Sequence, residues 1–529
     1  MADELAKVTE ESARGGFFLI SGTAIATVVM AVASIIIARF LGPELYGQYT
    51  LALVVPQLLF LFTDLGINQG ITKFTASFRV KNETARIRRV IKYGLLLRVF
   101  TGIAIFAINY ALADSFASIL LQRPELAFYT RIAAISILFQ VIFTTANSAF
   151  IGLDKTEFSA LNTNIQAIAK ATVSIGLVLL GFSVTGAILG HVIGYFVAAI
   201  AGIAILWIVI HEKTSDQNDN NFSNDLKIII HYGIPLYISI LLTGIIPLYQ
   251  NIILAIFTTD ADIGNYKAAV NFISLITVLT VPIATALLPA FSKLNSLSAQ
   301  KIRTFYQLAN KYTAMIIVPV TFLLIIFSKA IVQIIYGSTY GSAPLFLAIC
   351  CLPYLLVGLG YLVLPSLYNG LGETKITLKM SLITFIILIV LSPILTKTYS
   401  VQGLIAAFII ASTASTLYGL HVARKNLQVL FATGALLKIY FNSAISTIPA
   451  LIMLYFWHSP QLLKTIIGGI AYLFLYTTLI PVTRTVILIE IEKALHITRK
   501  IPFFAPIARP ILLYQQRLAN FRFGTQHKS

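Results

Sequence analysis

The sequence predicts an all-α protein that crosses a membrane many times. Of its 529 residues 58% are hydrophobic and only 11% are charged, whereas soluble proteins carry about 25% charged residues. The apolar residues form long continuous runs, and a bilayer core requires about 20 such residues per helix. The runs are apolar on every face and lack the alternation typical of membrane barrel strands. This composition disfavours a soluble multi-domain enzyme, a disordered chain and a nucleic-acid binder.

About fourteen apolar runs are long enough to cross a bilayer. A polar segment, Met1–Arg14, precedes the first of them, and that run is longer than the apolar core of a signal peptide. We therefore expect the first run to remain in the protein as a helix. The expected spans are residues 16–38, 47–70, 93–113, 129–151, 161–181, 186–210, 228–257, 266–290, 312–336, 344–368, 379–396, 402–422, 437–457 and 464–484.

Loop charge predicts the orientation of these spans. The formal net charge is +18, and Lys and Arg gather after the second span, after the eighth and after the last. Because cytoplasmic loops collect Lys and Arg, we expect both termini in the cytoplasm and the protein in the cytoplasmic (plasma) membrane. The cations after the second span are Lys73, Arg79, Lys81, Arg86, Arg88, Arg89 and Lys92.

Two short sequence matches indicate an internal repeat. Residues 38–49 and 255–266 share Ala, Phe, Gly and Tyr at an offset of 217, and residues 148–156 and 366–374 share Ser, Gly, Leu and Thr at an offset of 218. Six expected spans separate the copies, and an even number preserves their orientation. We therefore expect parallel repeats, related by an axis along the membrane normal.

The repeat predicts two six-helix lobes around a central cavity, the geometry of alternating access. The two Cys residues, Cys350 and Cys351, are adjacent and form no disulfide framework. The tail beyond the spans is expected either as an interfacial segment on the anionic cytoplasmic leaflet or as a disordered basic tail. The expected parts are an N-terminal tail (1–15), a first lobe (16–212), a cytoplasmic linker (213–225), a second lobe (226–424), two further helices (425–488) and the basic tail (489–529).

The start of the chain resembles a known family. The segment Arg39-Phe40-Leu41-Gly42-Pro43-Glu44, with Tyr46-Gly47 and Tyr49 and followed by Asp64-Leu65-Gly66, is similar to the opening signature of the polysaccharide-flippase branch of the multidrug/oligosaccharidyl-lipid/polysaccharide exporter superfamily. The signature covers the first two spans, and the resemblance in span count and repeat layout covers most of the chain. It implies translocation of undecaprenyl- or dolichyl-linked oligosaccharides from the inner to the outer leaflet.

Asp64 is the one acidic residue that falls well inside an expected span. A charged group at this depth is costly, so it is a candidate for a functional role. Two interpretations are open: a coupling-ion or proton site, and a cap at a broken helix end, because Leu65-Gly66 follows.

Lys170 lies near the middle of the fifth span, too far from either interface to snorkel easily. Asn162, Gln166, Lys170 and Ser174 recur every four residues and share one helix face. The matching second-copy residues are Met380, Thr384, Leu388 and Ser392, so the stripe belongs largely to the first lobe. Lys suits a pyrophosphate headgroup, which favours a substrate cavity; the alternative is a structural pair with an acid such as Asp64.

Other polar residues of the spans extend the predicted substrate cavity. These side chains could line a hydrophilic path for a glycan, or they could form hydrogen bonds that hold neighbouring helices together. Pro235 and Pro247 predict a bent seventh span. For Arg39, Arg98 and Arg131, which lie near span ends, we expect snorkelling. The further cavity candidates are Gln140 in the fourth span, His231, Gln250 and Asn251 in the seventh, and Lys267 at the start of the eighth.

The sequence contains no enzyme motif, and we expect neither a cofactor nor a metal site. The expected partners are a lipid-linked glycan, anionic lipids at the basic loops and tail, and glycan-assembly proteins, with no nucleic acid. One alternative is a cation-coupled multidrug exporter of the same superfamily, which would be expected to carry several acids in its lobes. A second is a membrane glycosyltransferase or polymerase, which needs acidic catalytic residues on a large external loop.

Overall fold

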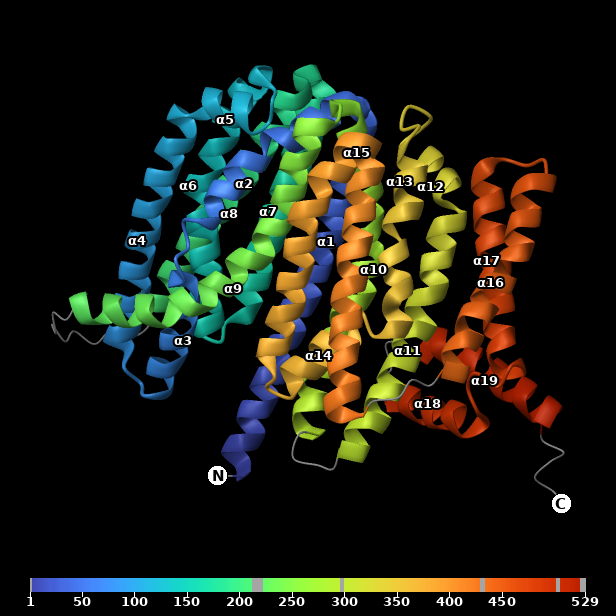
Figure 1. The fold of residues 1–529 in the computed structure, drawn as a ribbon. Helices are drawn as coiled ribbons and strands as arrows, with labels where there is room; N and C mark the ends of the chain where they lie inside the picture. The colour runs from blue at the N-terminus through green and yellow to red at the C-terminus, as the bar shows by residue number, and fades with distance from the viewer. Residues whose placement is uncertain (1, 212–221, 295–298, 429–432, 501–504, 524–529) are drawn as a thin grey trace. The chain divides into compact units, whose positions relative to one another are not determined.

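The computed structural model describes a helical protein over all residues except 1, 212–221, 295–298, 429–432, 501–504 and 524–529 (Figure 1). The described residues contain no strand, which confirms the all-α class. The α-helices are α1 (Ala2–Ala52), α2 (Val54–Leu61), α3 (Ile67–Val80), α4 (Thr84–Ala111), α5 (Ala113–Ile119), α6 (Ala127–Gly152), α7 (Thr156–Leu177), α8 (Ser183–His211), α9 (Phe222–Phe257), α10 (Asp260–Leu294), α11 (Ala299–Ile326), α12 (Ser328–Ile335), α13 (Ala343–Cys350), α14 (Val363–Gly370), α15 (Thr374–Leu427), α16 (Thr433–Phe456), α17 (Gln461–Val482), α18 (Leu488–Lys500) and α19 (Ala505–Phe523). Shorter helical pieces are η1 (Pro124–Leu126), η2 (Val178–Phe182) and η3 (Leu352–Leu359).

The protein is a multi-pass membrane protein. Nine described segments are long and apolar enough to cross a membrane, or ten when the bent pair Ala343–Leu359 and Val363–Gly370 is taken as one span. Three of the nine contain a residue with a left-handed backbone, at which a right-handed helix cannot continue. These residues are Gly42 (φ 74°), Ser183 (φ 51°) and Ser400 (φ 53°), and each lies between two of the predicted spans. The count of fourteen stays a prediction.

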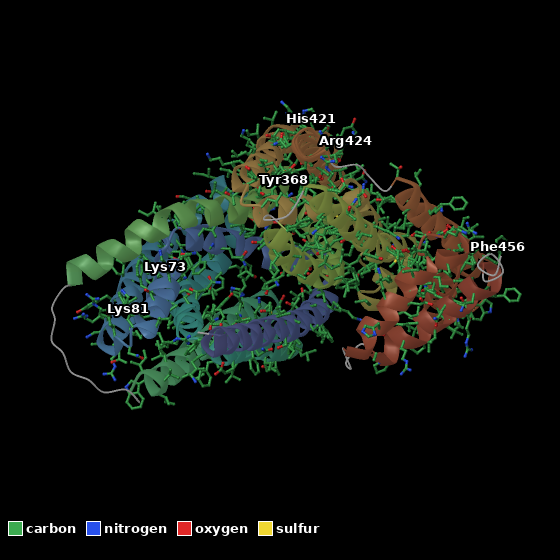
Figure 2. All side chains as sticks on the ribbon, turned by 90° about the horizontal axis from the view of Figure 1, so that it is seen from below. Lys73, Lys81, Tyr368, His421, Arg424 and Phe456 are labelled. Atoms are coloured by element: carbon green, nitrogen blue, oxygen red, sulfur yellow. The ribbon has the colours of Figure 1, made fainter. Side chains whose placement is uncertain are left out.

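The chain forms two compact units. The first consists of Met1–Asn271 with Leu391–Leu404, and the second of Phe272–Val390 with Ile405–Ser529. Two cations predicted for the loop after the second span are labelled in the view from below: Lys73 lies within α3, and Lys81 lies in the turn that follows it (Figure 2). The boundaries of the two predicted lobes stay a prediction.

Each unit has an apolar core, and the two cores use equivalent positions of the repeat. In the first unit, three residues of α6 pack with one residue of α8. In the second, the core holds four residues of α14 and three of α15, among them the equivalents of those four residues. The same packing is therefore built twice from two sequences that share few residues. The four pairs are Ala146 and Leu364, Ala149 and Leu367, Phe150 and Tyr368, and Leu206 and Ala423, at offsets of 217 or 218.

Backbone breaks recur in both copies. Ser183 (φ 51°, ψ −133°) and Ser400 (φ 53°, ψ −141°) have nearly the same conformation and lie 217 positions apart. Asp154 (φ 59°) and Gly372 (φ 81°), 218 positions apart, are both left-handed at the turn that follows a helix. Because such conformations are uncommon for residues other than Gly, their recurrence supports the repeat more strongly than the short sequence matches do.

The glycines of the second sequence match have equivalent contacts. A Cβ atom added at Gly152 would lie 2.8 Å from the carbonyl oxygen of Thr72 in α3, and one added at Gly370 would lie 2.7 Å from that of Leu288 in α10. In both units, therefore, a glycine lets one helix end approach the backbone of another helix.

The glycines of the first match bring the two copies against each other. A Cβ atom at Gly47 would lie 1.9 Å from the carbonyl oxygen of Asp260, and one at Gly264 would lie 1.8 Å from that of Pro43. Pro43 and Asp260 are themselves equivalent positions, 217 apart. The contact is thus reciprocal, as it is across a two-fold axis. All four residues belong to the first unit.

The described helices after α17 pack within the second unit. α18 and α19 join a core that includes Tyr476 and Ile491. The Lys311 ammonium donates to both carboxylate oxygens of Glu490, each at 2.8 Å. Burial raises the pKa of Glu490, but hydrogen bonds from Lys311 and a backbone N–H outweigh it and hold the pKa below its usual value. The segment 489–529 therefore contains two packed helices within its described residues.

The reciprocal glycine contact leads to a first prediction. Gly47→Ala and Gly264→Ala should each destabilise the first unit by at least about 1–3 kcal/mol, the usual cost of overpacking, because the new methyl group meets backbone that cannot move aside. Gly176→Ala in α7 is the matched control, since nothing lies within 4 Å of its added Cβ. Thermal unfolding of the purified variants measures the difference. Equal unfolding temperatures for all three variants would contradict the contact.

Candidate functional site

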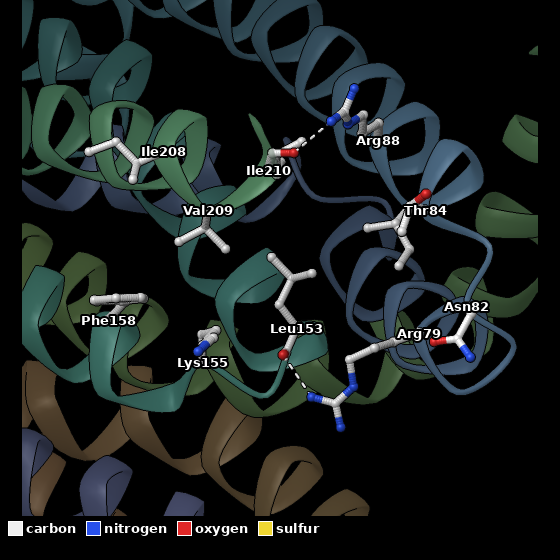
Figure 3. A pocket seen from close by; sticks show the side chains of 11 residues that line it. Arg79, Asn82, Thr84, Arg88, Leu153, Lys155, Phe158, Ile208, Val209 and Ile210 are labelled. Carbon is white, nitrogen blue, oxygen red and sulfur yellow. Dashed lines mark hydrogen bonds between the residues drawn. The ribbon is translucent and has the colours of Figure 1, made fainter. Parts of the chain in front are cut away.

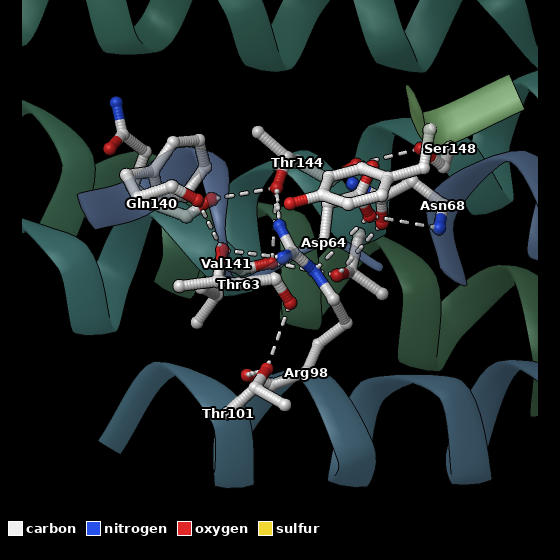
Figure 4. Close-up of polar contacts among 12 residues, drawn as sticks. Thr63, Asp64, Asn68, Arg98, Thr101, Gln140, Val141, Thr144 and Ser148 are labelled. Atoms are coloured by element: carbon white, nitrogen blue, oxygen red, sulfur yellow. Dashed lines mark hydrogen bonds and ion pairs between the residues drawn. The ribbon is translucent and has the colours of Figure 1, made fainter. Parts of the chain in front are cut away.

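Arg98 is the centre of a buried polar network in the first unit (Figure 4). It lies in the middle of α4, and its side chain is 1% exposed. One terminal nitrogen donates to the hydroxyl of Thr63 at 2.6 Å and the other to that of Thr144 at 3.0 Å. Its Nε lies 3.8 Å from the Asp64 carboxylate, which supplies the opposite charge. The network joins α4 and α6 to the segment between α2 and α3.

Asp64 lies at the break between α2 and α3. Leu65 (φ 47°) and Gly66 (φ 83°) are both left-handed, and the Asp64 carboxylate accepts the backbone N–H of Asn68 at 3.1 Å. This is a cap on the first turn of α3, as one of the two interpretations expected. Gly66 also contacts the backbone of Gly233 in α9, because a Cβ atom at Gly66 would lie 2.1 Å from the Gly233 carbonyl carbon. The role of Asp64 in ion coupling stays a prediction.

The expectation for Arg98 is wrong, and so is one alternative for Asp64. Arg98 does not snorkel, because α4 begins at Thr84 rather than at residue 93, which moves Arg98 to the middle of the helix. Nor does Asp64 pair with Lys170, since Arg98 is the cation beside its carboxylate. The polar start of α4 hid its length from a search for apolar runs.

The stripe on α7 faces the helices that pack beside it. Asn162 is fully buried and donates to the side-chain oxygen of Asn147 in α6 at 2.9 Å. Gln166 is buried, and the hydroxyl of Ser174 donates to a backbone carbonyl of α8 at 3.2 Å. Asn162 and Ser174 thus serve interhelical packing. Lys170, between them, is half-buried.

Close packing of α7 on α8 sets the position of Lys170. A Cβ atom at Gly194 would lie 2.6 Å from the Lys170 Cβ, and one at Gly190 would lie 2.1 Å from the Ser174 hydroxyl. With Gly186 these glycines form a repeated small-xxx-small pattern, which lets membrane helices approach closely. That pattern was the signal in the sequence for this contact.

Around Lys170 the structure places aromatic and neutral polar groups. His191 of α8, which sequence reasoning did not single out, interacts electrostatically with Lys170, and its ring meets that of Tyr195 edge-on with centroids 5.1 Å apart. The Tyr195 hydroxyl is hydrogen-bonded to the side chain of Gln140, a predicted cavity residue. The described residues bring neither a carboxylate nor a hydrogen-bond acceptor to the Lys170 ammonium.

A second lysine lies in α10, about two turns from its start. The Lys267 ammonium donates to the side-chain oxygen of Asn251 in α9 at 2.5 Å, which joins two predicted cavity residues. Asn251 is buried, and Gln250 beside it is half-buried. The side chain of His231 lies outside the described residues. Like Lys170, Lys267 has no carboxylate partner within the described part of the chain.

The end of the first unit with the reciprocal glycine contact also carries an ion pair. The Asp260 carboxylate accepts Arg123 Nε at 2.9 Å and the Gln48 amide at 3.2 Å. Arg123 also donates to the carbonyl oxygen of Thr258 at 2.7 Å. The side chains of Arg123 and Asp260 are only 20% and 11% exposed. Polar and backbone contacts together therefore close this end between α1 and α10.

Comparison with known proteins places the chain in a family. Residues 12–295, more than half of the chain, match the family model described as polysaccharide biosynthesis protein. The chain belongs to this family. The match begins in α1 and covers the Arg98 network, Lys170 and Lys267.

Two relatives extend the comparison. The lipid II flippase MurJ of Bacillus subtilis (strain 168) is 21% identical over 461 residues, which cover 78% of this chain and 82% of the relative. The probable low-salt glycan biosynthesis flippase Agl15 of Haloferax volcanii is 21% identical over 180 residues, which cover 34% of this chain and 38% of the relative.

Solved structures share the fold. An inward closed conformation of the lipid II flippase MurJ aligns with a TM-score of 0.69 at 19% identity, covering 88% of this chain and 99% of that one. An inward-facing multidrug resistance MATE family transporter of the MOP superfamily aligns with a TM-score of 0.61 at 18% identity, covering 78% of this chain and 98% of that one. At these identities the likeness establishes the fold alone. Together with the family match, it confirms the resemblance to this superfamily of exporters.

A second prediction concerns the Arg98 network. Removing one partner of a buried ion pair costs about 3–5 kcal/mol, and we expect Arg98→Ala to fall at the lower end because the Asp64 side chain is 18% exposed. Asp64→Asn keeps an oxygen for the cap on α3 and should recover part of the loss when combined with Arg98→Ala. Unfolding temperatures of the single and double variants measure the coupling. A double variant no more stable than Arg98→Ala would show that the pair does not hold the network together.

Proposed function

We propose that the protein is a flippase that moves a lipid-linked oligosaccharide from the cytoplasmic to the outer leaflet for the assembly of surface polysaccharide or glycoprotein. The carrier lipid would be a polyprenyl pyrophosphate. The description of the family and the names of the two relatives, both flippases, support this substrate class.

The single observation that carries the proposal is the presence, in membrane spans, of two lysines to which the described residues bring no carboxylate. A Lys at the centre of a membrane helix costs about 2.5–3.5 kcal/mol on insertion scales. For Arg98, Asp64 and two hydroxyls offset the cost of a charge in a span. The described residues give Lys170 and Lys267 no carboxylate. Uncompensated positive charge in a medium of low dielectric constant attracts an anion strongly, and a pyrophosphate group supplies one.

Alternating access of the two predicted lobes would move the headgroup across the membrane, from the cytoplasmic to the outer leaflet. The reciprocal contact of Gly47 and Gly264, with the Arg123–Asp260 ion pair, closes one end of the first unit and supports a gate there. Such contacts would have to separate to release a glycan at that end. The cavity residues Gln140, Asn162, Gln166, Gln250 and Asn251 would give the glycan hydrogen-bonding partners, and His231 remains a candidate for the same role.

The alternative functions fit the structure less well. A cation-coupled multidrug exporter needs acids that are free to bind an ion, whereas Asp64 caps α3 and lies beside Arg98. Ion coupling at Asp64 is kept as a minor part of the flippase proposal, because its side chain is 18% exposed. A glycosyltransferase or polymerase would be a catalyst, whereas both relatives are named as flippases.

The orientation follows from the basic loops. We place both termini in the cytoplasm, within the cytoplasmic membrane, because Lys and Arg gather in the loops on that side. Anionic lipids at these loops and at the tail, and proteins of glycan assembly, would be the further partners.

A third prediction tests the two lysines. Lys170→Gln and Lys267→Gln should each weaken the binding of a polyprenyl-pyrophosphate oligosaccharide by about 10- to 100-fold, because a hydrogen bond to a charged group contributes about 1.5–3 kcal/mol. Lys170→Arg should keep part of the affinity, since the charge remains while reach and geometry change. Native mass spectrometry of the purified protein with added lipid measures binding directly.

Lys397→Gln in α15 is the matched control, because that lysine is exposed. It should bind like the unchanged protein. Removing a charge from a span should ease membrane insertion, so expression of the two test variants should not fall. Full affinity of both test variants at normal expression would overturn the proposed role of the lysines.

A further inference from the structure

A cavity of about 330 Å³ lies at the end of the first unit that carries the basic loop after α3 (Figure 3). Its lining comes from the end of α3, the turn after it and the first turns of α4, from the turn between α6 and α7 with the start of α7, and from the end of α8. The volume is at the lower end of the range of about 300–1,000 Å³ found for small-molecule sites. It lies apart from the Arg98 network and from both lysines of the spans, none of which lines it.

Three cations line the cavity: Arg79, Arg88 and Lys155. None of the described residues that line it is Asp or Glu. Arg79 donates to the carbonyl oxygen of Leu153 at 2.7 Å, and Arg88 to that of Ile210 at 2.8 Å, so both guanidinium groups are fixed at helix ends. A planar guanidinium carries five N–H donors in a fixed fork that matches the geometry of a phosphate.

Arg79 and Lys155 each have an acidic neighbour that offsets part of their attraction for an anion. Arg79 forms an ion pair with Asp154 at 3.1 Å, and Lys155 lies 4.0 Å from Glu157, with both partners of the second pair 40% exposed or more. Ion pairs this exposed are weak, so Lys155 keeps most of its attraction for an anion.

The opposite wall of the cavity is apolar. Phe158 of α7 and three consecutive residues of α8, Ile208, Val209 and Ile210, line it. Ile208 is 56% exposed, and Trp207 beside it is 62% exposed, on a helix that spans the membrane. Trp near a helix end is typical of the interface between the bilayer and water. The cavity therefore combines fixed cations with a wall that continues onto a membrane-facing surface.

The second copy of the repeat shows which of these features belong to the scaffold. Arg303 of α11 donates to the carbonyl oxygen of Leu427 at 2.6 Å, and Leu427 is the equivalent of Ile210 at an offset of 217. In both copies, therefore, an arginine of a neighbouring helix donates to the carbonyl at the end of the equivalent helix. Lys155, in contrast, corresponds to Glu373 at an offset of 218, which reverses the charge. The scaffold does not require the positive charge of Lys155.

We propose that this cavity binds the phosphate headgroup of an anionic phospholipid from the leaflet that faces the basic loops. The phosphate lies among Arg79, Arg88 and Lys155, and the lipid chains lie along Ile208 and Trp207. A soluble anion would use the cations but gain nothing from the apolar wall. The inference adds a defined site to the general expectation that anionic lipids gather at basic loops, and it does not depend on the flippase proposal.

The test is lipid binding to the full-length purified protein after delipidation. Phosphatidylglycerol and phosphatidylcholine are added separately, and bound lipid is counted by native mass spectrometry. We expect phosphatidylglycerol to bind more tightly than phosphatidylcholine. Lys155→Gln should weaken phosphatidylglycerol binding about fivefold, and Lys155→Glu, which installs the residue of the second copy, should weaken it further. Lys81→Glu is the matched control, since Lys81 is an exposed cation of the same loop that does not line the cavity.

Other outcomes would overturn the assignment. An equal loss of phosphatidylglycerol binding in Lys81→Glu and Lys155→Glu would show that the whole basic surface attracts the lipid and that the cavity is not a defined site. Inorganic pyrophosphate that displaces the lipid at equal concentration would show an anion site without a role for the apolar wall. Undecaprenyl pyrophosphate that binds more tightly than phosphatidylglycerol, and is lost in Lys155→Glu, would assign the cavity to the transported class of lipid instead.

Discussion

The cost of placing charge inside a membrane governs this structure. Arg98 is tolerated within a span because Asp64 and the hydroxyls of Thr63 and Thr144 surround it, and this network joins α4 and α6 to the segment between α2 and α3. Lys170, near the middle of a predicted span, and Lys267, about two turns into α10, have no carboxylate partner among the described residues. A charge in a span with no described counter-charge attracts an anion, and we propose that the pyrophosphate of a lipid carrier supplies it.

The repeat separates what the fold needs from what the function adds. Both copies keep the glycines that let backbones touch, the left-handed serines at Ser183 and Ser400, and the apolar positions of the cores. The charges differ between the copies. Arg98 corresponds to Met315 and Lys170 to Leu388, at offsets of 217 and 218. Because the second copy forms its core without these cations, they are best understood as additions to a shared scaffold.

Sequence reasoning could recover the helical class and the repeat, because continuous apolar runs and a constant offset are local signals. It misplaced Arg98, because α4 starts with a polar stretch that a hydropathy pattern assigns to a loop. It also missed His191, since a buried histidine beside a lysine on another helix leaves no trace in spacing. The glycine pattern around Gly190 was visible in the sequence, but which lysine it packs against depends on the pairing of α7 with α8. The lysines of the spans could be predicted as candidates, whereas their lack of carboxylate partners required the structure.

Transbilayer movement in proteoliposomes tests the central claim most directly. The substrate is a fluorescent polyprenyl-pyrophosphate oligosaccharide, and the comparison is the same polyprenyl oligosaccharide joined by a neutral linkage in place of pyrophosphate. If uncompensated lysines draw the headgroup into the protein, the pyrophosphate lipid should cross well above the rate in empty vesicles, and the neutral lipid should not. Equal movement of both lipids, or movement of neither, would contradict the account.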